Sequence, residues 1–222
     1  DVGFFQDPDA DRLAIATADG RFIGEEATLP LAVEAVLEKT PGPIVVNCST
    51  SGMTAAIAQQ RGIDCHVSAV GEANVVDQML AHNAVIGGEG NGGVIDPNVV
   101  LVRDSIVGMA LVLERMCGSG TLVSVASLAA GLPQRVMLKT KVSLGAEARG
   151  SGLAAALDRI AAAFPEATAS RLDGLRLDEG TTWVLVRASN TEPIVRIVAE
   201  AVDQAAAHDA IERATNALAS AG

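Results

Sequence analysis

The sequence is poor in aromatic residues and in the side chains that bind transition metals. It contains no tyrosine, one tryptophan and four phenylalanines, so its cores must be built mainly from aliphatic side chains. Its three histidines are scattered, which argues against a histidine-based metal centre. Its three cysteines, Cys48, Cys65 and Cys117, are widely spaced in apolar sequence. We therefore expect reduced thiols in a cytoplasmic protein, and neither a disulfide nor a zinc site.

Positive charge and long apolar runs are also scarce. The chain has 16 lysine and arginine residues against 27 aspartate and glutamate residues, which gives a net charge of −11. This balance argues against a nucleic-acid partner or an anionic membrane surface, although local basic loops can still bind a small anion. The apolar run from Ile106 to Leu113 is followed by Glu114 and Arg115 and is too short to cross a bilayer. We expect neither a nucleic-acid partner nor a membrane partner.

The remaining pattern, with 49% apolar residues in a chain of 222, predicts packed domains. Thr28 is expected to cap a helix that has Pro30 in its first turn, and a proline–glycine turn ends this helix. We place a domain boundary after residue 42. Residues 43–133 alternate strands with helices, which predicts a mainly parallel α/β sheet. In residues 134–222 several strands lie between two helices, which predicts an α+β domain.

An unusual concentration of carboxylates lies near the start of the chain. Asp7, Asp9 and Asp11 stand at alternate positions between two short apolar runs, where side chains two residues apart point the same way. Three converging carboxylates repel one another unless a cation lies between them, and Mg²⁺ suits few carboxylates plus a phosphate. A solvated acidic turn is the alternative. An EF-hand is excluded, because Arg12 stands where that loop needs glycine and Ala18 where it needs glutamate.

A glycine-rich loop, residues 88–93, follows a predicted strand. It matches the G-x-G-x-x-G pattern of dinucleotide-binding proteins, but residues 94–97 do not open a helix and Glu89 would repel a pyrophosphate. We therefore reject a nicotinamide-binding site. Glycines let the backbone approach a ligand closely, and Glu89 and Asn91 could bind the hydroxyls of a sugar. The alternative is a flexible glycine turn.

A third polar loop, residues 187–193, lies between two predicted strands near the C-terminus. It offers a guanidinium from Arg187, two hydroxyls, an amide and turn N–H groups, and Arg196 follows it. Such donors suit the several acceptor oxygens of a phosphate. The alternative is a solvated hairpin loop. Together, the three loops predict phosphoryl transfer on a phosphorylated sugar, with Mg²⁺ neutralising the charge that develops.

These loops give the chain a specific resemblance to the α-D-phosphohexomutase superfamily, which includes phosphoglucomutase, phosphomannomutase and phosphoglucosamine mutase. Residues 7–12 (D-P-D-A-D-R) resemble its metal loop, residues 88–93 (G-E-G-N-G-G) its sugar loop and residues 187–193 (R-A-S-N-T-E-P) its phosphate loop. Residues 173–176 (D-G-L-R) match a further signature of the family. The four motifs occur in family order over nearly the whole chain.

The resemblance implies a four-domain enzyme of which this chain holds only part. Residues 1–42 would end domain 2, residues 43–133 would form α/β domain 3, and residues 134–222 would form an α+β domain 4 of the TBP-like kind. Domain 1, which carries a phosphoserine in the family, has no counterpart in the sequence. We therefore expect that an N-terminal part of the natural protein is absent and that the chain alone is inactive. The family moves a phosphoryl group reversibly between the 1- and 6-positions of a hexose, through this phosphoserine and a bisphosphorylated intermediate.

The resemblance also assigns a cofactor, Mg²⁺, and roles to individual residues. The ion would be held by three carboxylates: Asp7, Asp9 and Asp11. Arg12 would lie near the phosphoserine, and Glu89 and Asn91 would contact hydroxyls of the hexose phosphate. The phosphate that is not transferred would be bound by five residues: Arg187, Ser189, Asn190, Thr191 and Arg196.

Two departures from the family pattern concern the substrate. Gly93 stands where many members have histidine, and Asn91 replaces the common serine. Residues 70–76 lack the lysine that phosphomannomutase-type members carry there. Both departures are typical of phosphoglucosamine mutases, so we expect glucosamine phosphate as the substrate. Phosphomannomutase or phosphoglucomutase specificity stays open, as do a non-catalytic sugar-phosphate-binding role and the oligomeric state.

Overall fold

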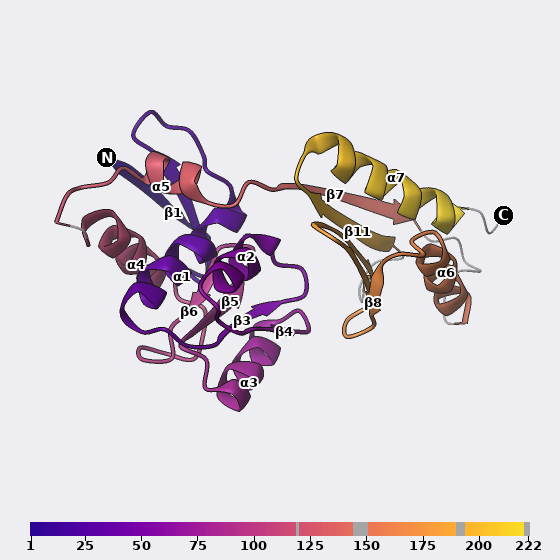
Figure 1. Cartoon of the computed structure of the whole chain (residues 1–222), viewed down its shortest axis with the longest axis horizontal. Helices are drawn as coiled ribbons and strands as arrows, with labels where there is room; N and C mark the ends of the chain where they lie inside the picture. The colour runs from indigo at the N-terminus through magenta and orange to yellow at the C-terminus, as the bar shows by residue number, and fades with distance from the viewer. Residues whose placement is uncertain (119, 144–150, 190–193, 220–222) are drawn as a thin grey trace. The chain divides into compact units, whose positions relative to one another are not determined.

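The chain folds into two compact units, Asp1–Gln134 and Arg135–Gly222 (Figure 1). The structure is a computed structural model. It describes four stretches of the chain: residues 1–118, 120–143, 151–189 and 194–219. Within these stretches, no helix is long and apolar enough to cross a membrane.

The N-terminal unit contains a two-stranded antiparallel sheet and a four-stranded sheet. The second sheet has the order β4–β3–β5–β6, in which the first three strands are parallel and β6 is antiparallel to β5. The strands are β1 (Val2–Gln6), β2 (Leu13–Thr17), β3 (Ile44–Asn47), β4 (Cys65–Ser68), β5 (Ile86–Glu89) and β6 (Gly93–Ile95). The helices are η1 (Glu25–Ala27), α1 (Thr28–Lys39), α2 (Gly52–Gln60), α3 (Glu72–His82), α4 (Ser105–Cys117) and α5 (Val125–Gly131). The mainly parallel α/β sheet expected for this part of the chain is confirmed.

The larger hydrophobic core of the N-terminal unit joins β2, α1, β3 and α4, and a separate smaller cluster contains Val45, Val75 and Met79. The larger core contains Leu13 of β2, Leu29 of α1, Ile44 of β3 and Val112 of α4, each at most 1% exposed. Helix α1 packs against α4 and against β5. The assignment of residues 1–42 to a separate domain stays a prediction, since α1 lies in the same core as the elements that follow it.

The start of α1 differs from the expectation. The helix begins at Thr28 itself, its N-cap residue is Ala27, and no side chain makes the cap hydrogen bond. Thr28 is fully buried, and its Oγ1 donates to the carbonyl of Leu13 (2.8 Å). The prediction of Thr28 as the N-cap is therefore wrong, because the hydroxyl joins α1 to β2 instead. Pro30 lies in the first turn as predicted.

The C-terminal unit is a five-stranded antiparallel sheet with two helices, so the predicted α+β domain is confirmed. The strand order is β7–β11–β10–β9–β8. The elements are β7 (Val136–Ser143), α6 (Ser151–Ala162), β8 (Thr168–Ser170), β9 (Leu175–Glu179), β10 (Thr182–Ala188), β11 (Ile194–Ala201) and α7 (Gln204–Ala219). Gly180, with a φ of +64°, occupies the first position of the two-residue turn between β9 and β10, where a tight hairpin favours glycine.

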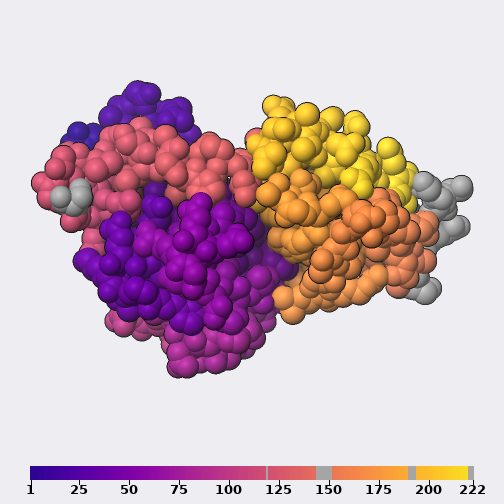
Figure 2. Space-filling view, viewed as in Figure 1, coloured from indigo at the N-terminus to yellow at the C-terminus, as the bar shows by residue number. Residues whose placement is uncertain are grey.

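The two faces of this sheet differ in character. Val186 and Ile197 belong to the core that includes residues of α6 and α7. Because side chains alternate along a strand and directly opposed residues share a face, Arg187, Arg196 and Lys141 lie on the opposite face. In the space-filling view, α7 forms a continuous yellow area on the surface of this unit (Figure 2).

Candidate active site

The connection between β1 and β2 turns tightly at Ala10, which has a positive φ of 57°. The amide of Ala10 donates to the carbonyl of Asp7 (3.0 Å), and Asp7 Oδ1 accepts from the amides of Asp11 (3.2 Å) and Arg12 (3.3 Å). One oxygen from each of Asp7, Asp9 and Asp11 lies within 4.8 Å of the others, and we call these residues the carboxylate trio. The alternate spacing does bring these side chains together, while the ion itself stays a prediction.

The pKa values of Asp7 and Asp11 are shifted in opposite directions. Burial raises the pKa of Asp11, as does its hydrogen bond with the Asp7 carboxyl group, against the opposite effect of Arg103. Partial desolvation also raises the pKa of Asp7, but hydrogen bonds from Asp11 and from the Arg12 amide outweigh it, so this pKa is lowered. Asp11 Oδ1 is buried and has no hydrogen-bond partner among the described residues. Such an oxygen beside two further carboxylates fits a hard cation such as Mg²⁺.

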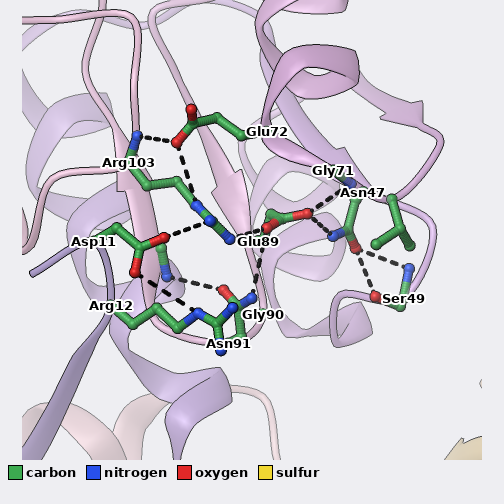
Figure 3. A network of polar contacts seen from close by, with 12 residues as sticks. Asp11, Arg12, Asn47, Ser49, Gly71, Glu72, Glu89, Gly90, Asn91 and Arg103 are labelled. Carbon is green, nitrogen blue, oxygen red and sulfur yellow. Dashed lines mark hydrogen bonds and ion pairs between the residues drawn. The ribbon is translucent and has the colours of Figure 1, made fainter. Parts of the chain in front are cut away.

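A single arginine joins this loop to the glycine-rich loop (Figure 3). The guanidinium of Arg103 forms ion pairs with Asp11 Oδ2 and Glu89 Oε2, and its Nε donates to Glu72 Oε2 (3.3 Å). The same oxygen of Glu72 accepts from the Arg103 amide (2.8 Å). Three carboxylates from three separate segments therefore share one cation, whose side chain is only 15% exposed.

Glu89 is almost completely buried, at 3% exposure, and both of its oxygens are engaged. Its Oε1 accepts from Asn47 Nδ2 (2.6 Å) and from the Gly71 amide (2.9 Å). Its Oε2 accepts from Arg103 and from Asn91 Nδ2, the latter at 3.5 Å. These bonds offset the cost of burying a charge and fix the direction of the carboxylate. The use of Glu89 and Asn91 as sugar ligands stays a prediction.

The glycines of this loop allow it to lie directly against its neighbours. Gly92 has a φ of +88°, and its carbonyl accepts from the Leu13 amide (3.1 Å). A Cβ at Gly90 would lie 2.6 Å from the carboxyl carbon of Glu26. Oε2 of this carboxylate accepts a hydrogen bond from the Ser51 amide (3.0 Å). The loop is therefore packed on both sides, and side chains at these positions would displace it.

The turn between β3 and α2 holds the side chain of Asn47, a hydrogen-bond donor to Glu89, in place. Asn47 Oδ1 accepts from the amide and hydroxyl of Ser49 and from the hydroxyl of Thr50, each at 2.9 Å. Thr50 Oγ1 accepts from the Gly90 amide (3.0 Å), which ties this turn to the glycine-rich loop. The orientation of Asn47 toward Glu89 is thus fixed by its neighbours.

The predicted phosphate ligands lie at the connection between β10 and β11. Two of them, Asn190 and Thr191, fall outside the described residues. Ser189 directly follows β10, and its amide donates to the carbonyl of Ile194 at the start of β11 (2.9 Å). This bond joins the two strands where the loop begins.

Strand register places three cations in one row across the C-terminal sheet. Arg187 of β10 lies opposite Arg196 of β11, which in turn lies opposite Lys141 of β7; we call these residues the basic row. Arg187 Nη2 forms an ion pair with Asp173 Oδ2 (2.9 Å), while Arg196 and Lys141 are exposed. Like charges in direct cross-strand register repel one another, so the basic row would attract an anion.

Comparison with known proteins decides the family. The family model described as phosphoglucomutase/phosphomannomutase, alpha/beta/alpha domain III, matches residues 25–136, just over half of the chain. The chain belongs to the phosphoglucomutase/phosphomannomutase family. The model of the C-terminal domain of this family matches residues 140–217. The resemblance drawn from the sequence motifs is confirmed.

Relatives within the family match nearly all of the chain. A protein from Thermococcus kodakarensis named phosphoglucomutase/phosphomannomutase is 36% identical over 221 residues, with 96% of this chain and 46% of its own length covered. A probable phosphoglucosamine mutase from Pyrococcus horikoshii is 30% identical, with 97% and 48% covered. The crystal structure of a family protein from Burkholderia thailandensis is similar with a TM-score of 0.79 and 26% identity, covering 100% of this chain and 48% of that one. The chain thus spans about half the length of the relatives it matches.

Arg103 and Lys141 are among the residues of these sites that were not singled out from the sequence. Arg103 occurs directly after the four apolar residues 99–102 and before Asp104, the N-cap of α4. A lone arginine in such a position is a signal for a buried ion pair, although its partners are too distant in sequence to be named. Lys141 could have been found from the alternation of β7, whose other face carries apolar side chains.

Proposed function

We propose that the complete protein is a phosphohexomutase that moves a phosphoryl group between the 1- and 6-positions of a hexose phosphate, with glucosamine phosphate as its substrate. The reaction would use an enzyme phosphoserine and a bisphosphorylated intermediate. Family membership supports this reaction class. The observation that carries the proposal is the presence, in one chain of this family, of both the carboxylate trio and the basic row. The first suits a divalent cation and the second suits a phosphate.

The carboxylate trio would hold Mg²⁺, which when bound would neutralise charge on the transferred phosphoryl group. Asp11 would contribute its buried Oδ1, and Asp7 and Asp9 would contribute the oxygens that converge with it. The side chain of Arg12 is 50% exposed and lies 3.7 Å from Asp7 Oδ2, so it would be available to a phosphate beside the ion.

Glu89 and Asn91 would bind the sugar hydroxyls. Glu89 already accepts four hydrogen bonds, which is about the capacity of a carboxylate. The longest of the four comes from Asn91 at 3.5 Å, so a sugar hydroxyl would replace this donor. The amide of Asn91 would then be released for a second hydroxyl. Binding in this way would keep the three bonds that orient Glu89.

The phosphate that is not transferred would bind beside the basic row. Arg187 supplies a fixed charge and a planar fork of donors, and Arg196 lies directly opposite it. Ser189, Asn190 and Thr191 of the adjoining loop would add hydroxyl, amide and backbone donors. Several donors around one anion match the several oxygens of a phosphate.

The choice of glucosamine phosphate rests on Gly93 and Asn91 of the glycine-rich loop and on the names of relatives such as the probable phosphoglucosamine mutase of Pyrococcus horikoshii. One observation favours a second specificity. The relative from Thermococcus kodakarensis, at 36% identity, is named phosphoglucomutase/phosphomannomutase. Glucose or mannose phosphate is therefore the second candidate substrate.

The test is a coupled assay on the complete natural protein with Mg²⁺ and a hexose bisphosphate primer. The 6-phosphates of glucosamine, glucose and mannose are compared by kcat/KM, and mass spectrometry follows phosphorylation of the enzyme. The highest kcat/KM is expected for glucosamine 6-phosphate, together with a phosphoserine. A higher value for glucose or mannose phosphate would overturn the substrate, and no turnover with any of the three would overturn the reaction.

A further inference from the structure

The side chain of Arg103 connects two loops for which different ligands are proposed. It forms ion pairs with Asp11 of the carboxylate trio and with Glu89 of the glycine-rich loop, and its Nε also bonds Glu72. Asp11 and Arg103 are 92 positions apart in the sequence. Among the described residues, Arg103 is the cation that pairs with the buried carboxylate of Glu89. Removing this guanidinium would leave that charge buried and unpaired. Leaving a buried charge uncompensated is costly, so this link is a constrained one.

Gly93 provides the space that Arg103 occupies. A Cβ at Gly93 would lie 3.0 Å from Arg103 Cγ and closer still to Cδ. Gly93 is not among the glycines with positive φ, so the site requires its small size and not its backbone freedom. In this chain that volume is filled by the stem of the Arg103 side chain.

Asp11 divides its two oxygens between two different directions. Its Oδ2 faces Arg103, whereas its Oδ1 is buried, makes no hydrogen bond in the described part of the chain and lies 3.8 Å from Arg12 Nε. A divalent ion at the trio would therefore share one carboxylate with the guanidinium. Two cations on one carboxylate repel each other, so the ion would push the guanidinium away from Asp11 and toward Glu89.

We infer that Arg103 is a positioning residue that couples cation binding at the carboxylate trio to the geometry of Glu89, and that position 93 is glycine in order to admit it. The inference rests on the proposed function only in taking Mg²⁺ as the ligand of the trio. Its consequence is that the glycine-rich loop reaches its final geometry when the ion is bound, so that cation and sugar bind cooperatively.

The test uses the 222-residue chain, Mg²⁺ alone and NMR of backbone amides. The amide of Gly71 reports on Glu89, because it donates to Oε1 (2.9 Å), and the amide of Asp11 reports on the trio. In the unaltered chain, Mg²⁺ should shift both amides with one dissociation constant. In Arg103→Met the Asp11 shift should persist and the Gly71 shift should vanish. Arg115→Met is the matched control, since Arg115 also forms ion pairs but with Glu34 and Glu38 of α1 and with neither loop, and it should retain both shifts.

The Mg²⁺ affinity of Arg103→Met gives a second readout. It should rise if Arg103 acts as proposed and fall if Arg103 only supports the loop. Arg103→Met removes a positive charge beside the ion, so the dissociation constant should fall about tenfold, whereas damage to the loop would raise it. Gly93→Ala as a single substitution should also lower the dissociation constant for Mg²⁺. Added to Arg103→Met, it should change that constant no further. If Arg103→Met does not fold, Arg103→Lys keeps the charge but not the planar fork. It should weaken the Gly71 shift and leave the affinity nearly unchanged.

The outcomes separate this inference from the proposed function. A Gly71 shift that persists in Arg103→Met, or a dissociation constant that rises, overturns the coupling and leaves the Mg²⁺ site standing. Absence of the Asp11 shift in the unaltered chain overturns the metal assignment and the coupling with it, and the assay on the complete protein then judges the reaction class independently.

Discussion

The N-terminal unit holds its candidate site through contacts between side chains, whereas the C-terminal unit holds its own through strand register. In the first, Arg103 reaches Asp11 across 92 positions of sequence, and Asn47 reaches Glu89 across 42. In the second, hydrogen-bonded strands bring Arg187 and Arg196 to directly opposed positions. A side-chain network depends on each of its members, while a row set by backbone register persists when one side chain is changed. Substitutions in the first unit should therefore have larger and less additive effects.

The largest effect is expected in the carboxylate trio. Asp9→Asn in the complete protein should lower turnover at limiting Mg²⁺ about a hundredfold or more, because metal stabilisation of developing charge contributes several kcal/mol. Steady-state kinetics over a Mg²⁺ series is the measurement, with the circular dichroism spectrum unchanged. Asp77→Asn, on an exposed position of α3, is the control and should behave as the unaltered protein. Equal turnover of the two variants would remove Asp9 from the metal site.

A somewhat smaller effect is expected where the glycine-rich loop packs on α1. A Cβ at Gly88 would lie 2.7 Å from Leu29 Cδ1 and 3.3 Å from the carbonyl carbon of Gly93. Gly88→Ala should therefore lower the free energy of unfolding by about 2 kcal/mol. Urea denaturation followed by circular dichroism measures it. Gly131→Ala, whose added methyl would meet open space, should cause little change; a similar loss in both variants would contradict the packing argument.

The pH dependence of Mg²⁺ binding should follow Asp11. Its pKa is raised by burial and by Asp7, whose own pKa is lowered, so Asp11 takes up a proton before Asp7 as the pH falls. Protonation removes one ligand, and the affinity should fall by at most about tenfold per pH unit below the raised pKa. Calorimetric titrations of the chain from neutral pH downward would show this. In Asp11→Asn the affinity should be weaker and flat over the same range, and an unchanged slope would point to another group.

In the C-terminal unit, Arg187→Lys should weaken phosphate binding about tenfold although the charge is kept, since the fork of donors is lost. The amide of Ser189 is the reporter, in titrations with glucosamine 6-phosphate and, as the control ligand, glucosamine. Only the phosphate sugar should shift it. Equal shifts with both sugars would mean that the loop is a hairpin connection and not a phosphate site.

The smallest effect is expected at the outer end of the basic row. Lys141→Ala should weaken binding of glucosamine 6-phosphate only a few-fold, and the difference should shrink at high salt because the side chain is exposed. Lys39→Ala removes the same charge from α1 of the other unit and should leave the titration unchanged. A Lys141→Ala effect as large as that of Arg187→Lys would show that register alone does not describe this row.

How far the sequence predicts the molecule follows the same division. The trio could be predicted because Asp7, Asp9 and Asp11 lie within five positions, and alternation along β11 places Arg196 on the polar face of the sheet. Arg103 could not be predicted as a partner of Glu89, because the residues around each of them in the sequence carry no information on a contact between separate segments. The prediction of Thr28 as a helix N-cap was wrong for the same reason, because its hydroxyl forms a tertiary hydrogen bond to β2 in place of the local cap.

One buried aromatic ring that belongs to neither candidate site gives this chain an intrinsic fluorescent probe. Trp183 of β10 is 4% exposed, donates from Nε1 to Glu200 Oε1 (2.9 Å) and lies under the guanidinium of Arg176, 4.1 Å from the ring centroid. The chain has no other tryptophan and no tyrosine. Its indole fluorescence therefore originates only in the C-terminal unit, and unfolding of the N-terminal unit is directly invisible to it. Fluorescence and circular dichroism recorded on one sample can thus separate the melting of the two units without any label being added.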